Sequence, residues 1–98
     1  MNFLINISEN TLRHIYEKHE DLVKILRVRD VEELKEVILD VLQDPDEIYE
    51  DKYKNYVKYY LKKINALWIN VVLVHNTVRT AYLISSKSYR KFKEKRWR

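Results

Sequence analysis

The sequence predicts an α+β fold in which two N-terminal helices pack on a four-stranded antiparallel sheet. Apolar residues recur with a helical period of about 3.6 before Pro45 and with a period of about 2 after it, as in strands. The 98 residues suffice for one modest core. We therefore expect a single domain over residues 1–86, with residues 87–98 as a basic C-terminal segment of the same domain.

The first predicted helix covers about residues 10–22. Ser8 and Asn10 are both suitable N-caps, and the apolar residues of this helix follow at helical spacing, namely Leu12, Ile15, Tyr16 and Leu22. Residues 3–7 form either a short strand or an extended lead-in to the helix. Residues 23–29 either extend the helix or form a separate turn, and the pattern leaves both alternatives open.

The second predicted helix covers residues 31–43, with its acidic face in water. Asp30 and Glu33 stand three residues apart in a capping-box arrangement, which marks a helix start. Pro45 ends this helix because proline cannot donate a backbone hydrogen bond. The apolar residues between these signals follow a helical spacing: Leu34, Val37, Ile38, Val41 and Leu42.

Four strands are predicted after the second helix, at residues 47–50, 56–64, 67–74 and 78–85, because these segments are rich in Tyr, Val and Ile. The breaks between the last three strands are Asn65-Ala66 and Asn76-Thr77. In a chain without glycine, Asn is the residue that tolerates the left-handed backbone of tight hairpin turns. We therefore expect two short hairpins and an antiparallel meander.

Charge is distributed very unevenly along the chain. Ten acidic residues against Lys35 alone give residues 30–51 a formal charge of −9, and thirteen Lys and Arg against Glu94 alone give residues 52–98 a charge of +12. Clustered cations favour nucleic acid as the partner of the C-terminal half. The alternative is that the two halves neutralise one another in the folded state.

The absence of cysteine excludes disulfides and thiolate metal sites, and the absence of glycine excludes a glycine-rich phosphate loop. No apolar run resembles a signal peptide or approaches the roughly 18 residues of a membrane span. We expect an intracellular, cytoplasmic protein that has no membrane partner.

His14 and His19 are the candidates for proton transfer, because the pKa of an unperturbed imidazole lies nearest neutrality. Their spacing corresponds to about 140° around a helix, which disfavours a joint zinc site, and the basic half offers no carboxylate pair for magnesium. We therefore expect neither a metal nor a cofactor. Arg13 and Lys18 of the same helix are candidates for substrate binding, and the alternative is that both histidines are ordinary surface residues.

The predicted strands also carry polar residues at alternate positions. Tyr60 and Lys62 share one face of their strand, and Thr80 and Tyr82 share one face of theirs, while Arg79 points the opposite way from Thr80. Lysine and threonine can bind a scissile phosphate, and tyrosine can stack on a base or donate to a phosphate oxygen. Taken singly, the tyrosines are equally compatible with the edge of a core and Lys62 with the surface.

These residues occur in a recognisable order over about residues 10–86. The order is Arg-His and Lys-His in the first helix, Leu-Gln-Asp-Pro-Asp-Glu-Ile after the second, then Tyr-Tyr-Leu-Lys, a Val-rich strand and Arg-Thr-Ala-Tyr. It resembles the small toxin-type and phage-encoded nucleases of the barnase, EndoU, colicin and RelE class. The resemblance implies two helices on a four-stranded antiparallel sheet and RNA cleavage without metal, by attack of the ribose 2′-hydroxyl.

The resemblance also implies a catalytic set drawn from three elements: His14, His19, Lys62, Thr80 and Tyr82. Tyr60 and Arg79 would then contact substrate, and which of Arg79, Thr80 and Tyr82 supplies the last catalytic group stays open. We expect one histidine to lie close to both Lys62 and Thr80. The partners implied are RNA, such as tRNA, and an acidic immunity or antitoxin protein, as for a hydrolase of viral or mobile-element origin.

The basic C-terminal segment supports a competing interpretation, a non-catalytic nucleic-acid-binding module. Ser86 or Ser88 would cap this segment, and Lys87, Arg90 and Lys91 would contact phosphate. The aromatic residues between its cations either stack on bases or anchor the segment to the core, namely Tyr89, Phe92 and Trp97. A third class is an inhibitor that uses the acidic segment to mimic nucleic acid.

Overall fold

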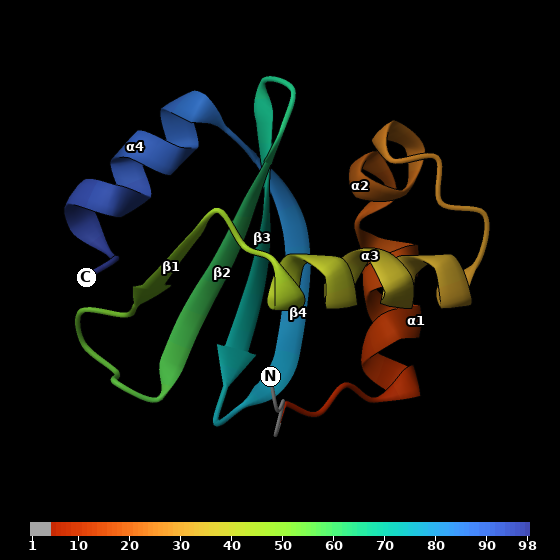
Figure 1. Cartoon of the computed structure of the whole chain (residues 1–98), viewed down its shortest axis with the longest axis horizontal. Helices are drawn as coiled ribbons and strands as arrows, with labels where there is room; N and C mark the ends of the chain where they lie inside the picture. Colours follow the sequence, from red (N-terminus) through yellow and green to blue (C-terminus); the bar gives the residue numbers. More distant parts are fainter. Residues whose placement is uncertain (1–4) are drawn as a thin grey trace.

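The structure is a computed structural model that describes residues 5–98 (Figure 1). Its helices are α1 (Glu9–Lys18), α2 (Glu20–Ile25), α3 (Val31–Gln43) and α4 (Ser86–Lys95). Its strands are β1 (Glu47–Glu50), β2 (Val57–Ile64), β3 (Leu67–Val74) and β4 (Thr77–Ser85). The predicted α+β class with a four-stranded antiparallel sheet is confirmed, although the N-terminal half holds three helices and a fourth follows the sheet.

The first predicted helix is interrupted at His19. Ser8 caps α1 by accepting a hydrogen bond from the backbone N–H of Thr11 at 3.1 Å, but His19 has φ −114° and ψ 66°, outside the helical region. The chain therefore starts a new helix, α2, and reaches α3 through a loop in which Arg27 has a φ of 55°. Of the expected lead-in, Phe3 lies outside the described residues, and Asn6 forms an isolated parallel bridge with Thr77.

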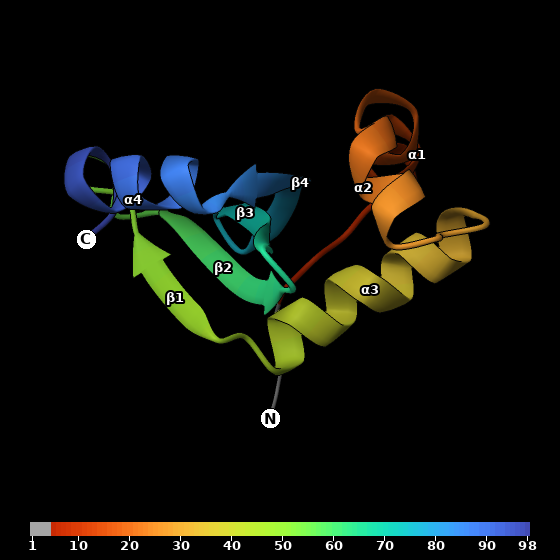
Figure 2. The same ribbon diagram turned by 90° about the horizontal axis from the view of Figure 1, so that it is seen from above.

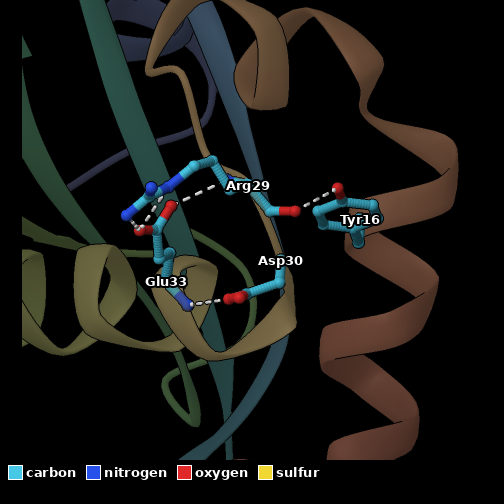
Figure 3. Close-up of polar contacts among 4 residues, drawn as sticks. All are labelled: Tyr16, Arg29, Asp30 and Glu33. Carbon is cyan, nitrogen blue, oxygen red and sulfur yellow. Dashed lines mark hydrogen bonds and ion pairs between the residues drawn. The ribbon is translucent and has the colours of Figure 1, made fainter.

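The start of α3 is tied to α1 through the residue before its N-cap (Figure 3). Asp30 accepts a hydrogen bond from the N–H of Glu33 at 2.9 Å, as the capping signal predicts. The Glu33 carboxylate does not return to the N-cap. It instead accepts from the backbone and guanidinium of Arg29 at 2.7–3.0 Å. The Tyr16 hydroxyl donates to the Arg29 carbonyl at 3.1 Å, which joins α1 to this capping network.

The sheet is an antiparallel meander in the order β1-β2-β3-β4 (Figure 1). Asn65 and Ala66 connect β2 to β3 as predicted, and Asn65 has a φ of 55°. The second turn lies one residue earlier than predicted, at His75 and Asn76, whose φ values of 50° and 61° are both positive. Positive φ at both central residues is the requirement of a type I′ hairpin turn.

The two faces of the sheet are covered by different elements (Figure 2). On the face that we call the α3 face, side chains of β3 and β4 form the first core with α1, α2 and α3, including Ile15, Leu34 and Ile69. On the opposite face, the α4 face, α4 lies across the strands. The second core lies there and includes Trp68 and Trp97.

The C-terminal segment is held in the second core by its aromatic residues. Ser85, rather than Ser86 or Ser88, caps α4 by accepting from the N–H of Ser88 at 3.1 Å. Tyr89 stacks on Trp68 with ring centroids 4.4 Å apart, and Trp97 is only 2% exposed. Of the two roles left open for these aromatic residues, the structure supports the anchor.

Candidate functional site

Polar side chains from α1 and β4 meet at the β4 edge of the sheet. His19 lies between α1 and α2, and its Nε2 is 3.4 Å from Oγ1 of Thr80. The same imidazole stacks on Tyr82, with ring centroids 5.8 Å apart and planes 29° from parallel. His14 lines a pocket of about 400 Å³ that also includes Arg79 and Thr80. Both predicted histidines therefore border Thr80.

An irregularity in β4 sets the direction of these side chains. Val72 pairs with Thr80, whereas Leu73 pairs with Val78, so Arg79 is an extra residue in the strand. Extra residues of this kind re-aim neighbouring side chains and are frequent beside active sites. Arg79 is accordingly exposed at the pocket of His14, while Thr80 and Tyr82 line a separate pocket on the α4 face.

That second pocket, of about 280 Å³, receives a cation from the end of α4. It lies between Tyr82 on the sheet and Phe92, Arg96 and Trp97 of the C-terminal segment. The Arg96 side chain is 64% exposed, and its Nε lies 3.8 Å from Oδ1 of the buried Asp51. The guanidinium is therefore held at the rim of the pocket.

Asp51 is held by neutral donors as well as by Arg96. Its carboxylate accepts from the Tyr59 hydroxyl at 2.7 Å and from the backbone N–H groups of Tyr53 and Lys54 at 3.1 Å. Burial alone would raise the pKa of Asp51, but these hydrogen bonds and Arg96 lower it overall, so the carboxylate is ionised at neutral pH. Burial and the hydrogen bond to Asp51 raise the pKa of Tyr59 to about 12.

Tyr82 is a neutral phenol at the centre of the candidate site. Burial raises its pKa, and its hydroxyl accepts a hydrogen bond from Nδ2 of Asn70 at 3.3 Å. The site thus gathers two imidazoles, a phenol, an aliphatic hydroxyl and two guanidinium groups around Thr80. These groups can move protons near neutral pH and can donate hydrogen bonds to a phosphate.

The structure does not bring Tyr60 and Lys62 into this group. Leu61, Asn70 and Tyr82 are register partners on the α4 face, so Lys62, one residue on, points to the α3 face. There Nζ of Lys62 lies 3.1 Å from Asp40 and 3.3 Å from Asp44, and its hydrogen bond to Asp40 and then that to Asp44 raise its pKa. Tyr60 packs against the first core.

The remaining predicted contacts lie on the surface. Arg13 forms an ion pair with Glu9 at 3.0 Å along the exposed side of α1. The other cations proposed to bind substrate are exposed at the end of α1 and along α4: Lys18, Lys87, Arg90 and Lys91. Arg96 and Asp51 were not among the predicted site residues. Arg96 is one of seven cations in residues 87–98, and only its buried partner, distant in the sequence, distinguishes it.

Comparisons of the chain with protein-family models, with curated proteins and with solved structures found no match. Within residues 5–98, no three His, Asp or Glu side chains gather where they could hold a metal ion. None of the helices formed by these residues has the length and apolar content needed to cross a membrane.

Proposed function

We propose that this protein is an endoribonuclease that cleaves RNA without a metal ion, with the scissile phosphate beside Thr80. The observation that carries the proposal is the meeting of His14 and His19 at Thr80, next to Tyr82 and Arg79. A pair of imidazoles beside hydrogen-bond donors is what general acid–base cleavage of a phosphodiester requires. The α+β architecture agrees with the resemblance to toxin-type nucleases, although architecture alone does not define a function.

In the proposed reaction the ribose 2′-oxygen forms a bond to phosphorus and the bond from phosphorus to the 5′-oxygen breaks. We assign the general base to His19, because contacts with Thr80 and Tyr82 fix its ring. It removes the 2′-hydroxyl proton, and His14 gives a proton to the leaving 5′-oxygen. Thr80 and Arg79 donate to the phosphate oxygens as negative charge develops there. The products are a 2′,3′-cyclic phosphate and a 5′-hydroxyl.

Incubation with total tRNA in EDTA, followed by a denaturing gel, tests this proposal directly. We expect fragments that carry 2′,3′-cyclic phosphate ends. Activity that disappears in EDTA and returns with magnesium would show that the metal-independent mechanism is wrong. If no RNA is cut at high protein concentration, the protein is not a ribonuclease acting on free RNA.

A non-catalytic RNA-binding module is the second candidate, because Lys87, Arg90 and Lys91 are exposed along one helix. Such a surface binds phosphate without chemistry. RNA binding without cleavage by the wild-type protein would favour this candidate over the endoribonuclease.

A further inference from the structure

A third pocket adjoins the candidate site at the start of β4. It has a volume of about 480 Å³ and lies between Lys54 and Tyr56, before β2, and Thr77, Val78 and Arg79 in β4. Thr11 and Arg79 line both this pocket and that of His14, so the two are contiguous. A bound chain can therefore pass from one pocket into the other along α1 and β4.

Tyr56 gives this pocket a rigid aromatic wall. Its ring is stacked on His75 with centroids 4.4 Å apart and planes only 5° from parallel. Tyr56 lines the pocket and His75 does not, so the imidazole supports the phenol ring from the side away from the pocket. The N–H of His75 also donates to the Tyr56 carbonyl at 3.0 Å, which fixes the two residues to one another.

The exposure of Tyr56 is consistent with a binding surface rather than with a core residue. Tyr56 is 41% exposed, whereas Tyr59 in the adjoining strand is 7% exposed. Lys54 and Arg79 lie on the same pocket, and no carboxylate within residues 5–98 forms an ion pair with either. A flat aromatic ring beside cations is the arrangement that binds single-stranded nucleic acid through base stacking and phosphate contacts.

We propose that this pocket is a base-binding subsite for single-stranded RNA. The base of a nucleotide next to the cleaved one stacks on Tyr56, and its phosphate lies between Lys54 and Arg79. The position relative to the cleaved bond rests on the proposed function, but base stacking itself needs no cleavage. Because a paired base is already stacked inside its helix, the subsite favours single-stranded over double-stranded RNA.

The test measures the affinity of a short, fluorescently labelled, single-stranded 2′-O-methyl oligoribonucleotide, which cannot be cut by 2′-hydroxyl attack. Tyr56→Ala should raise Kd by about 5- to 150-fold, the range expected for the loss of one base–aromatic stack. Tyr56→Phe keeps the ring and should leave Kd unchanged. Tyr53→Ala is the matched control, because Tyr53 is 82% exposed three residues away. If Tyr56→Ala does not fold by circular dichroism, Tyr56→Leu replaces it.

The outcomes separate the subsite from the proposed function. An equal Kd for the Tyr56 and Tyr53 variants would overturn the subsite, even if the wild-type protein cleaves RNA. A larger Kd for Tyr56→Ala alone would establish the subsite. If the wild-type protein then cuts no RNA, only the endoribonuclease proposal fails. Binding of the duplex form with wild-type affinity, and with the same loss in Tyr56→Ala, would also contradict the subsite.

Discussion

The two faces of the sheet use similar polar side chains in different ways. On the α3 face, Lys62 is held by Asp40 and Asp44 of the acidic helix. At the β4 edge and on the α4 face, His19 and Thr80 contact one another beside open pockets. Strand position alone therefore does not make a polar residue functional. The elements that pack against each face determine whether its side chains are paired within the protein or left for a ligand.

The charge of the covering helices strengthens this difference. The acidic segment, residues 30–51, supplies α3, and a pocket of about 460 Å³ on the α3 face is lined by Glu33, Glu36 and Asp40. These carboxylates repel a phosphate chain. The basic half supplies β4 and α4, so the cations lie on the side where the histidines are. The local charges therefore mark two surfaces of different use and do not simply cancel.

The largest expected effect separates the two faces by catalysis. His19→Ala should lower kcat for RNA cleavage by about 10²- to 10⁴-fold, the usual contribution of a general acid or base. Lys62→Ala should change kcat by less than about threefold, because Lys62 is paired to α3 on the other face. Steady-state kinetics on one RNA substrate compares them, with Glu17→Ala, an exposed position of α1, as the control. An equal loss in both variants would contradict the division of the faces.

Stability tests whether the α4 face is as much a core as the α3 face. Trp97→Ala should lower the free energy of unfolding by about 3–5 kcal/mol, because it empties the centre of the second core. Leu34→Ala in the first core should cost about 2–5 kcal/mol. Urea denaturation measures both. A cost below about 1 kcal/mol for Trp97→Ala would mean that α4 is a loosely attached tail.

Sequence patterns predicted local structure well because its causes are local. The change from a helical to an alternating period placed all four strands to within one residue. The interruption at His19 was missed because Leu22 continues the apolar spacing of Ile15 across it. The second turn moved by one residue because His75, not Thr77, takes the first left-handed position.

The candidate site was only partly predictable because it depends on contacts between distant elements. Alternation shows which residues of one strand share a face, but the pairing register decides which faces of two strands coincide. Thr80 and Lys62 fall on opposite faces through this register and the extra residue Arg79. Arg96 is placed by Asp51 and by the packing of α4, and no local pattern encodes either contact.

The pH dependence of stability compares a buried carboxylate with an exposed one. Because the folded state lowers the pKa of Asp51, its contribution is present above the ordinary pKa and is lost as pH falls through the lowered value. Asp51→Asn should lower the free energy of unfolding by about 1–3 kcal/mol at neutral pH, and the difference from wild type should shrink below about pH 4. Asp44→Asn, at a carboxylate that is 84% exposed, should change it by less than about 1 kcal/mol. A constant difference at all pH values would show that Asp51 contributes through packing alone.

The smallest expected effect concerns affinity along α4. Deletion of residues 87–98 would remove Trp97 from the core, so point substitutions are the better test of RNA binding. Arg90→Ala and Lys91→Ala remove exposed charges, and each should weaken RNA binding and reduce the slope of log K against log salt by about 0.7 if its phosphate contact is lost. The value of kcat should stay constant, because these side chains bind substrate and transition state equally. Lys35→Ala is the control on α3, where neighbouring carboxylates exclude phosphate, and should leave the slope unchanged. A slope that falls equally in Lys35→Ala would mean that RNA binding does not distinguish the two faces.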